Sequence, residues 1–244
     1  MTELLHTRDE LNAWLEHTQG RRGVVLTMGA LHQGHQALMA SAREAVGANG
    51  TVLVTVFVNP LQFGPHEDFA QYPRTLDADV EVCREARVDA VFAPSIDEVY
   101  PPNEPTMRYD AGPLEDELEG ASRPGHFAGV LTVVARLLTL THADVTCFGE
   151  KDFQQLALVR RLQFLEPALA KCEFIGVPTK RDPDGLAQSS RNRYLSADER
   201  AQALAIPACI QLVQSLCAEG RPAAEAERRG RNLLAAAPGV NVDY

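Results

Sequence analysis

The 244-residue sequence has no apolar run of the roughly 20 residues needed to cross a bilayer as a helix. Its longest strongly apolar run is Val52–Val58. The first residues, Met1–His6, lack the basic and then apolar layout of a signal peptide. We therefore expect a soluble, cytoplasmic protein with no membrane partner.

Basic residues are in deficit. Lys and Arg total 23 against 33 Asp and Glu, which gives a formal net charge of −10. A negative global field disfavours polyanionic partners, so we expect no nucleic-acid partner. A small anionic substrate is compatible with this charge, because a few basic side chains in a cleft reverse the potential locally.

The five cysteines are scattered and form no Cys-x-x-Cys pair. This spacing gives no support for a disulfide framework or a zinc site. We interpret them as reduced, buried residues and expect no protein metal site; they are Cys83, Cys147, Cys172, Cys209 and Cys217.

What the sequence does have is an alternation of strand and helix patterns. Helical spacing is clearest over Phe127–Leu140 and Phe153–Leu165. The alternation predicts an α/β fold with a Rossmann-like, doubly wound parallel sheet. Short runs that are apolar on both faces, typical of buried parallel strands, cover Gly23–Thr27, Thr51–Val58, Val88–Phe92, Asp144–Phe148 and Phe174–Val177.

The pattern changes after the last of these strands. Asp184-Gly185 predicts a hairpin turn, and Ser196–Glu199 forms a capping box that opens an Ala-rich helical region. We expect a first domain over 1–176 and a small α+β C-terminal domain over 177–244. Val240–Tyr244 resembles the beginning of a strand, so this second domain is expected to be short at its C-terminal end.

Ligands of an open parallel sheet bind beyond the carboxyl ends of its strands, so the loops after the strands are the candidate sites. The first loop, Thr27–His35, runs into a helix whose N-terminal amides favour an anion. Gly29 and Gly34 have P-loop spacing, but His35 stands where the P-loop lysine would be, and no G-x-G-x-x-G fingerprint is present. His32 and His35 can face one phosphate.

His-x-Gly-His is the arrangement of nucleotidyl transfer, in which imidazoles stabilise charge growing on an α-phosphate and on the leaving pyrophosphate. The ordinary alternative is a pair of surface histidines that cap a helix.

The second loop, Val58–Gly64, is followed by Tyr72–Thr75. Asn59 and Gln62 are neutral hydrogen-bonding groups, suited to orienting hydroxyls and a carboxylate without added charge. The alternative is a Pro/Gly loop whose amides satisfy only its own backbone.

The third loop, Phe148–Gln155, places Lys151 at the start of a helix, where it could contact phosphate, and Gln155 one turn further on. The alternative is that Asp152 caps the helix and Lys151 is solvated. Beyond the hairpin, Leu186–Arg193 contains two hydroxyls followed by Arg191, which suits a triphosphate. Its alternative is a polar turn.

A further candidate anion contact lies in Arg123–Phe127. Taken together, the chain from about Gly23 to Ser196 resembles the pantothenate synthetase (pantoate–β-alanine ligase) family of the His-x-Gly-His nucleotidylyltransferase superfamily. The blocks that carry the resemblance are Thr27–His35, Phe57–Gly64, Tyr72–Thr75, Arg123–Phe127, Phe148–Gln155 and Ser189–Leu195.

The resemblance implies a two-step reaction. The carboxylate of (R)-pantoate attacks the α-phosphate of Mg-ATP and gives pantoyl adenylate and pyrophosphate. The amine of β-alanine then attacks the acyl carbon and gives pantothenate and AMP. The resemblance also implies a homodimer and a C-terminal lid. We expect the phosphates and water to supply most of the Mg²⁺ ligands.

Roles are carried over from the resemblance position by position. His35 would be the proton donor, with His32 and Lys151 as its catalytic companions. Pantoate and β-alanine would contact Gln62 and Gln155, together with Asn59 and Arg123. ATP would be held by Met28, Gly29, Ala30, Leu31, His32, Gln33, Gly34, His35, Gly149, Glu150, Lys151, Asp152, Lys180, Gln188, Ser189, Ser190 and Arg191.

The sequence departs from the family pattern at four of its positions. Leu26 replaces a common proline and Gln33 a common acidic residue. Lys180 replaces an apolar residue near the adenine, where the contact is expected through backbone, and Gln188 replaces Met or Leu.

Three other functions compete with this interpretation. A nucleotidylyltransferase acting on a phosphorylated acceptor would share the two histidines but would need basic residues in its acceptor pocket. A regulatory protein would bind ATP without turnover. A Rossmann dehydrogenase would need the missing glycine fingerprint.

Overall fold

The Val-rich segments of the sequence form one parallel sheet in the computed structural model, which describes residues 2–64, 67 and 69–244. Within that part of the chain the strand order is β1-β4-β3-β2-β5-β6, and every pairing is parallel. The strands are β1 (Glu3–Leu5), β2 (Arg22–Thr27), β3 (Thr51–Val56), β4 (Ala90–Phe92), β5 (Val145–Gly149) and β6 (Glu173–Val177).

The five predicted strands are confirmed, with ends that differ by one or two residues. β1 was not predicted. It has three residues and pairs only with β4 at the edge of the sheet, so it is too short to show a periodic pattern.

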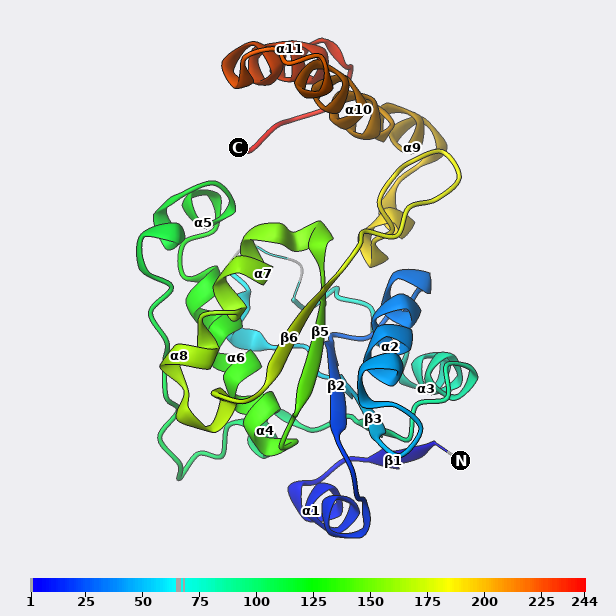
Figure 1. Ribbon diagram of the computed structural model, residues 1–244, viewed down its shortest axis with the longest axis vertical. Helices are drawn as coiled ribbons and strands as arrows, with labels where there is room; N and C mark the ends of the chain where they lie inside the picture. The colour runs from blue at the N-terminus through cyan, green and yellow to red at the C-terminus, as the bar shows by residue number, and fades with distance from the viewer. Residues whose placement is uncertain (1, 65–66, 68) are drawn as a thin grey trace. The chain divides into compact units, whose positions relative to one another are not determined.

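Helices cover both faces of this sheet, with α2 and α3 on one face and α6, α7 and α8 on the other (Figure 1). The helices are α1 (Arg8–His17), α2 (Gln33–Val46), α3 (Leu76–Glu85), α4 (Ile96–Val99), α5 (Glu119–Ser122), α6 (His126–Leu140), α7 (Phe153–Val159) and α8 (Leu162–Leu165). Short 3-10 turns are η1 (Pro60–Gln62), η2 (Gly112–Asp116), η3 (Glu150–Asp152) and η4 (Pro167–Leu169).

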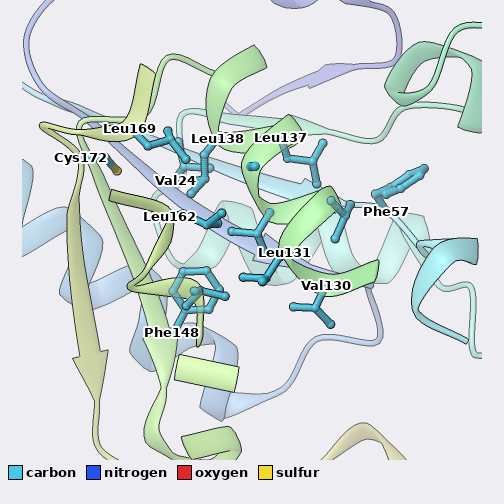
Figure 2. Close-up of a cluster of buried hydrophobic side chains, with 14 of the residues drawn as sticks. Val24, Phe57, Val130, Leu131, Leu137, Leu138, Phe148, Leu162, Leu169 and Cys172 are labelled. Atoms are coloured by element: carbon cyan, nitrogen blue, oxygen red, sulfur yellow. The ribbon is translucent and has the colours of Figure 1, made fainter. Parts of the chain in front are cut away.

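Two buried clusters of apolar side chains lie on opposite faces of the sheet. Val24 belongs to the cluster that includes α6, whereas its neighbour Val25 belongs to the cluster that includes α2 and α3. Successive side chains of a strand point to opposite faces, which explains why these strands are apolar throughout. Figure 2 shows Val130, Leu131 and Leu138 of α6 packed with Val24 in the larger cluster.

The predicted helix over Phe127–Leu140 is confirmed as α6, but the single helix predicted over Phe153–Leu165 is wrong. That segment forms two short helices, α7 and α8. The hydrogen-bond ladder changes between them, because the Arg161 N–H donates to the Leu158 carbonyl, three residues back instead of four, at 3.0 Å.

The chain divides after Pro178 into two compact units, two residues beyond the boundary predicted between 176 and 177. The second unit begins with the predicted hairpin. Arg181 and Ala187 pair as an antiparallel bridge, and Gly185 has the positive φ of +93° that the turn requires. The helices of this unit are η5 (Ser190–Tyr194), α9 (Ala197–Ala203), α10 (Ala205–Ala218) and α11 (Ala223–Ala236).

The capping box at the start of α9 is confirmed, since Ser196 and Glu199 each accept from the other's backbone N–H. The strand expected at Val240–Tyr244 is wrong, because these residues are irregular and pair with no strand that the structure describes. A strand needs a hydrogen-bonded neighbour, which sequence pattern cannot supply.

One helical stretch of the second unit, Ala197–Ala218, passes a test of length and apolarity for a membrane span, with a mean hydropathy of 1.4. A single stretch of this kind is weak evidence for a membrane span, and 11% of its most apolar window is buried. Within this stretch lies Cys217, which is exposed although burial was expected, because it follows the buried Leu216 and so lies off the buried face of α10. Cys209 is half-buried, while Cys83, Cys147 and Cys172 are buried as predicted.

Candidate active site

The strand order reverses between β2 and β5, which are neighbours in the sheet. From β2 the chain proceeds outward through β3 and β4, and it then returns to add β5 and β6 on the other side. Such a reversal opens a crevice at the carboxyl ends of the strands. The three loops singled out in the sequence follow β2, β3 and β5, so they leave the sheet at this crevice.

The loop after β2 is held in shape by a buried carboxylate. The backbone N–H groups of Ala30 and Leu31 donate to Asp79 Oδ2 and Oδ1 at 3.1 and 2.7 Å. Asp79 lies on α3 and is 2% exposed. Gly29 has φ +88° and its missing Cβ would lie 3.0 Å from Asp79 Oδ2, so glycine is needed at this approach. We call residues 28–35 the β2–α2 segment.

The two histidines of this segment have defined ring orientations. His32 is the N-cap of α2, and its Nδ1 accepts from the Gly34 N–H at 3.1 Å. His35 Nδ1 accepts from the His32 N–H at 3.2 Å, and the ring centroids are 4.1 Å apart. Because both Nδ1 atoms accept, the hydrogen of each neutral ring is on Nε2. Helix capping, the ordinary alternative, is therefore true of His32, and it uses Nδ1 of the ring.

His35 is a neutral base in this environment. Burial, followed by the nearby His32 and then the charge of Lys151, lowers the pKa of His35 to about 3. At neutral pH the ring therefore offers a hydrogen bond and carries no full charge. An anion bound beside it would favour the protonated form, so proton donation by His35 requires such an anion.

Lys151 supplies the positive charge beside the histidines. It is the second residue of η3, the turn that begins directly after Gly149, the last residue of β5. Its exposed Nζ is 2.9 Å from Asp152 Oδ1. Asp152 occupies the N-cap position of α7 but makes no capping hydrogen bond, so the capping alternative is wrong here. Glu150 lies on η3 as well, and Gln155 is half-buried on α7.

Residues 57–64, called the β3–η1 segment below, are organised by Asn59, which is 1% exposed. Asn59 Nδ2 donates to Gln62 Oε1 and to the Gly129 carbonyl, each at 3.2 Å. Asn59 Oδ1 accepts from the Leu61 N–H at 3.2 Å and from the Tyr100 hydroxyl at 3.0 Å. As in the ordinary alternative, Asn59 satisfies its own loop. It also fixes the amide of Gln62.

Gln62 connects the two segments. Its Nε2 lies 3.0 Å from Met28 Sδ, so the half-buried amide of the β3–η1 segment faces the first residue of the β2–α2 segment. The histidine-bearing loop and the neutral amide loop are therefore in direct contact.

Arg123 does not present a free guanidinium to an anion. Its Nε and Nη2 pair with the two carboxylate oxygens of Glu67 at 2.7 Å each, and its Nη1 pairs with Glu119 at 2.8 Å. The raised pKa of Arg123 follows from these carboxylates, which outweigh the opposing effect of burial. Arg123, predicted to contact an anion, is part of an ion-pair network next to the β3–η1 segment.

Sequence reasoning missed Asp79, although a signal was present. Leu76, Asp79, Val80 and Cys83 follow the i, i+3, i+4, i+7 spacing of one helix face, so an acid falls within an apolar stripe. A buried carboxylate needs hydrogen-bond donors, and two loop amides supply them.

The remaining predicted ATP residues belong to the second unit. The Lys180 carbonyl accepts from the Gln188 N–H at 2.9 Å across the hairpin, so this exposed lysine has its backbone engaged. Gln188 Nε2 donates to Asp182 at 2.9 Å. Ser189 caps η5 by accepting from the Arg191 N–H, and Ser190 is the first residue of that turn.

Comparison with known proteins decides the family. The family model described as pantoate-beta-alanine ligase matches residues 3–244. This chain belongs to the pantoate–β-alanine ligase family. Pantothenate synthetase from Streptomyces avermitilis is 60% identical over 205 residues, which are 84% of this chain and 60% of that protein. The chain thus spans less than two thirds of the length of that relative.

Solved structures of the family share the fold. The crystal structure of pantothenate synthetase from Thermus thermophilus has a TM-score of 0.91 and 44% sequence identity. The match covers 100% of this chain and 86% of the Thermus thermophilus chain. Another match is pantoate-beta-alanine ligase from Francisella tularensis, complexed with beta-gamma ATP and beta-alanine. It has a TM-score of 0.78 and 34% sequence identity, and the match covers 86% of this chain and 80% of the Francisella tularensis chain. The α/β fold with a parallel sheet is therefore that of the family.

Proposed function

We propose that the chain catalyses the ATP-dependent condensation of (R)-pantoate with β-alanine. In the first step a pantoate carboxylate oxygen attacks the α-phosphorus, and the bond to pyrophosphate breaks. In the second the β-alanine amine attacks the acyl carbon of pantoyl adenylate, AMP leaves with the carboxylate oxygen, and the amine loses a proton. Family membership and the ligands named for the Francisella tularensis relative support this assignment.

The observation that carries the proposal is the contact between Gln62 Nε2 and Met28 Sδ at 3.0 Å. Adenylation requires a carboxylate and an α-phosphate in contact. Here a neutral amide loop that suits the first adjoins a histidine-bearing helix N-terminus that suits the second. Holding two reactants in this way replaces a bimolecular encounter with a positioned one.

The groups that would stabilise negative charge lie on the side that would hold the triphosphate. The Nε2–H groups of His32 and His35, the charge of Lys151 and the N-terminus of α2 would stabilise negative charge as pyrophosphate leaves. Gln62 and Gln155 would bind the hydroxyls and carboxylate of pantoate. Neutral donors suit this task, because a cation there would stabilise the carboxylate and weaken its attack.

We assign Mg²⁺ to the ATP phosphates. The described residues contain no group of three His, Cys, Asp or Glu side chains that could hold a metal ion, so the triphosphate and water would provide most of its ligands. When bound, Mg²⁺ would neutralise charge on the phosphates.

The proposal extends to the rest of the chain. The first unit would bind ATP, pantoate and β-alanine, and the second would act as a lid through Lys180, Gln188, Ser189, Ser190 and Arg191. Two copies would form a cytoplasmic homodimer, with no nucleic acid or membrane as partner.

The test is mass-spectrometric product analysis of the purified chain with Mg-ATP, (R)-pantoate and β-alanine, beside mixtures that omit each substrate. The full mixture should give pantothenate and AMP. Without β-alanine, pyrophosphate and bound pantoyl adenylate should form. ATP binding with no pyrophosphate under any condition would support a binding protein instead. Pyrophosphate formed only with a phosphorylated acceptor would support the other nucleotidylyltransferase.

A further inference from the structure

His126, the first residue of α6, bonds to the backbone of Gln62. Its Nδ1 is 2.8 Å from the Gln62 carbonyl oxygen, and its Nε2 is 3.0 Å from Nη1 of Arg123. A carbonyl can only accept and a guanidinium can only donate. Both bonds therefore exist in one protonation state, a neutral ring with its hydrogen on Nδ1. This is the tautomer opposite to that of His32 and His35.

The same turn of α6 contacts the β3–η1 segment through backbone as well. A Cβ on Gly129 would lie 2.1 Å from the Leu61 carbonyl oxygen and 2.9 Å from Gln62 Cα. Only glycine permits this approach. The Gly129 carbonyl also accepts from Asn59, the residue that holds the Gln62 side-chain oxygen. Gln62 is thus supported at its carbonyl, at its Cα and at its side chain.

The charges around His126 are balanced by the ion pairs of Arg123. Glu67 and Glu119 accept from the three nitrogens of the guanidinium, and Glu119 Oε1 lies 3.9 Å from His126 Nε2. His126 is 8% exposed, and burial lowers its pKa, with Arg123 contributing in the same direction. The network therefore holds a neutral ring with its Nδ1–H directed at Gln62.

We propose that the first turn of α6 sets the position of Gln62 toward pantoate, the acceptor of the adenylyl group. In this proposal His126 is a positioning residue, which acts through the Gln62 carbonyl. Arg123, assigned to substrate from sequence, acts in this account by orienting His126. The inference rests on the proposed function in one respect, the assignment of Gln62 to pantoate.

Two substitutions at His126 separate positioning from bulk stability. The side-chain amide nitrogen of asparagine takes the place of Nδ1, whereas that of glutamine takes the place of Nε2. We expect His126→Asn to keep KM for pantoate within about threefold of wild type. His126→Gln should raise it roughly tenfold, the value of one lost hydrogen bond of about 1.4 kcal/mol. KM for ATP should change little in either variant.

A structural role alone would affect both substrates and both variants alike. Equal pantoate KM in His126→Asn and His126→Gln, or parallel rises in the pantoate and ATP values, would overturn the proposal. Thermal unfolding of each variant, measured beside kinetics, shows whether the fold is retained.

Nitrogen-15 NMR of the histidine rings provides a second readout that does not depend on turnover. At neutral pH the His126 signals should show hydrogen on Nδ1, whereas those of His35 should show hydrogen on Nε2. A His126 ring protonated on Nε2 would contradict the inference. If wild type releases no pyrophosphate with pantoate, the proposed function fails. The tautomer, and the response of the Gln62 amide signals to His126→Gln, would still decide the positioning role.

Discussion

The β2–α2 segment and the β3–η1 segment lie side by side at the carboxyl ends of the strands, yet they are built in opposite ways. The first is held from behind by the carboxylate of Asp79 and presents imidazole and backbone donors. The second is held from behind by neutral groups of α6 and presents a carboxamide. One segment suits developing negative charge, and the other suits a nucleophile that must keep its reactivity.

In the proposed reaction, this difference would allow the site to stabilise one anion without trapping another. If cations lay on both sides, the attacking carboxylate would be stabilised as much as the transition state, and no acceleration would follow. Here the guanidinium behind the acceptor side, that of Arg123, is neutralised by Glu67 and Glu119. The rings on the two sides also differ in tautomer, since His35 donates from Nε2 and His126 from Nδ1.

Removing the donor of the first segment should have the largest effect. His35→Ala is expected to lower the rate of adenylation about 10²–10³-fold, as for the loss of one positioned transition-state donor. The measurement is pyrophosphate release in the presence of pantoate. His17→Ala is the matched control and should be neutral, since His17 lies on the exposed side of α1. Near-normal turnover in a folded His35→Ala protein would remove His35 from its role.

Removing the carboxylate behind the same segment should cost stability as well as ATP binding. Asp79→Ala leaves two loop amides without their acceptor, at about 1–3 kcal/mol for each buried group. We expect the free energy of unfolding in urea to fall by roughly 2–6 kcal/mol. Asp77→Ala, on the exposed side of α3, should cost a few tenths of a kcal/mol through the helix dipole. Equal losses in the two variants would argue against the stabilising role of Asp79.

The second segment is tested by Gln62→Ala. Pantoate affinity should fall roughly tenfold, the value of one or two neutral hydrogen bonds, while ATP affinity stays close to wild type. Isothermal titration calorimetry with each ligand separates the two. Equal weakening of both would move Gln62 out of the acceptor site.

The charge state of His35 should also affect the pH dependence of stability. His35 has a folded pKa of about 3 against 6.5 for the unfolded chain, so the unfolded state binds more protons between these values. The free energy of unfolding should therefore fall as pH drops from 6.5 toward 3, by at most about 1.4 kcal/mol per pH unit for this group. Above about pH 7.5 the group contributes almost no slope, because the ring is then neutral in both states.

His35→Gln should flatten that slope in urea titrations between about pH 7 and pH 5. His17→Gln, on the exposed side of α1, should leave it unchanged. A slope equal to that of wild type in His35→Gln would mean that folding does not lower the pKa of this ring.

The fold was largely predictable because buried parallel strands are apolar on both faces, as Val24-Val25 shows in β2. β1 was missed because a strand of three residues is too short to show an alternating apolar pattern. The break between α7 and α8 was missed because the helical spacing of apolar residues continues through Phe153–Leu165. These errors arise where tertiary contacts, and not local pattern, decide the structure.

The candidate site was predictable in part, because polar and charged residues follow the carboxyl ends of β2, β3 and β5. His32, His35 and Lys151 could be found because charged or aromatic nitrogen groups at a helix N-terminus are informative by themselves. The supporting residues were harder to find. Asp79 lies 48 residues from Leu31, and His126 lies 64 residues from Gln62, so no local spacing connects either pair.

The most direct test of the central claim, that a carboxylate and an α-phosphate react across the two segments, follows oxygen atoms. Pantoate labelled with oxygen-18 in both carboxylate positions is converted with Mg-ATP and β-alanine, and the products are weighed by mass spectrometry. Attack of the carboxylate on the α-phosphorus predicts one labelled oxygen in AMP and one in the amide of pantothenate. Unlabelled AMP would contradict the account.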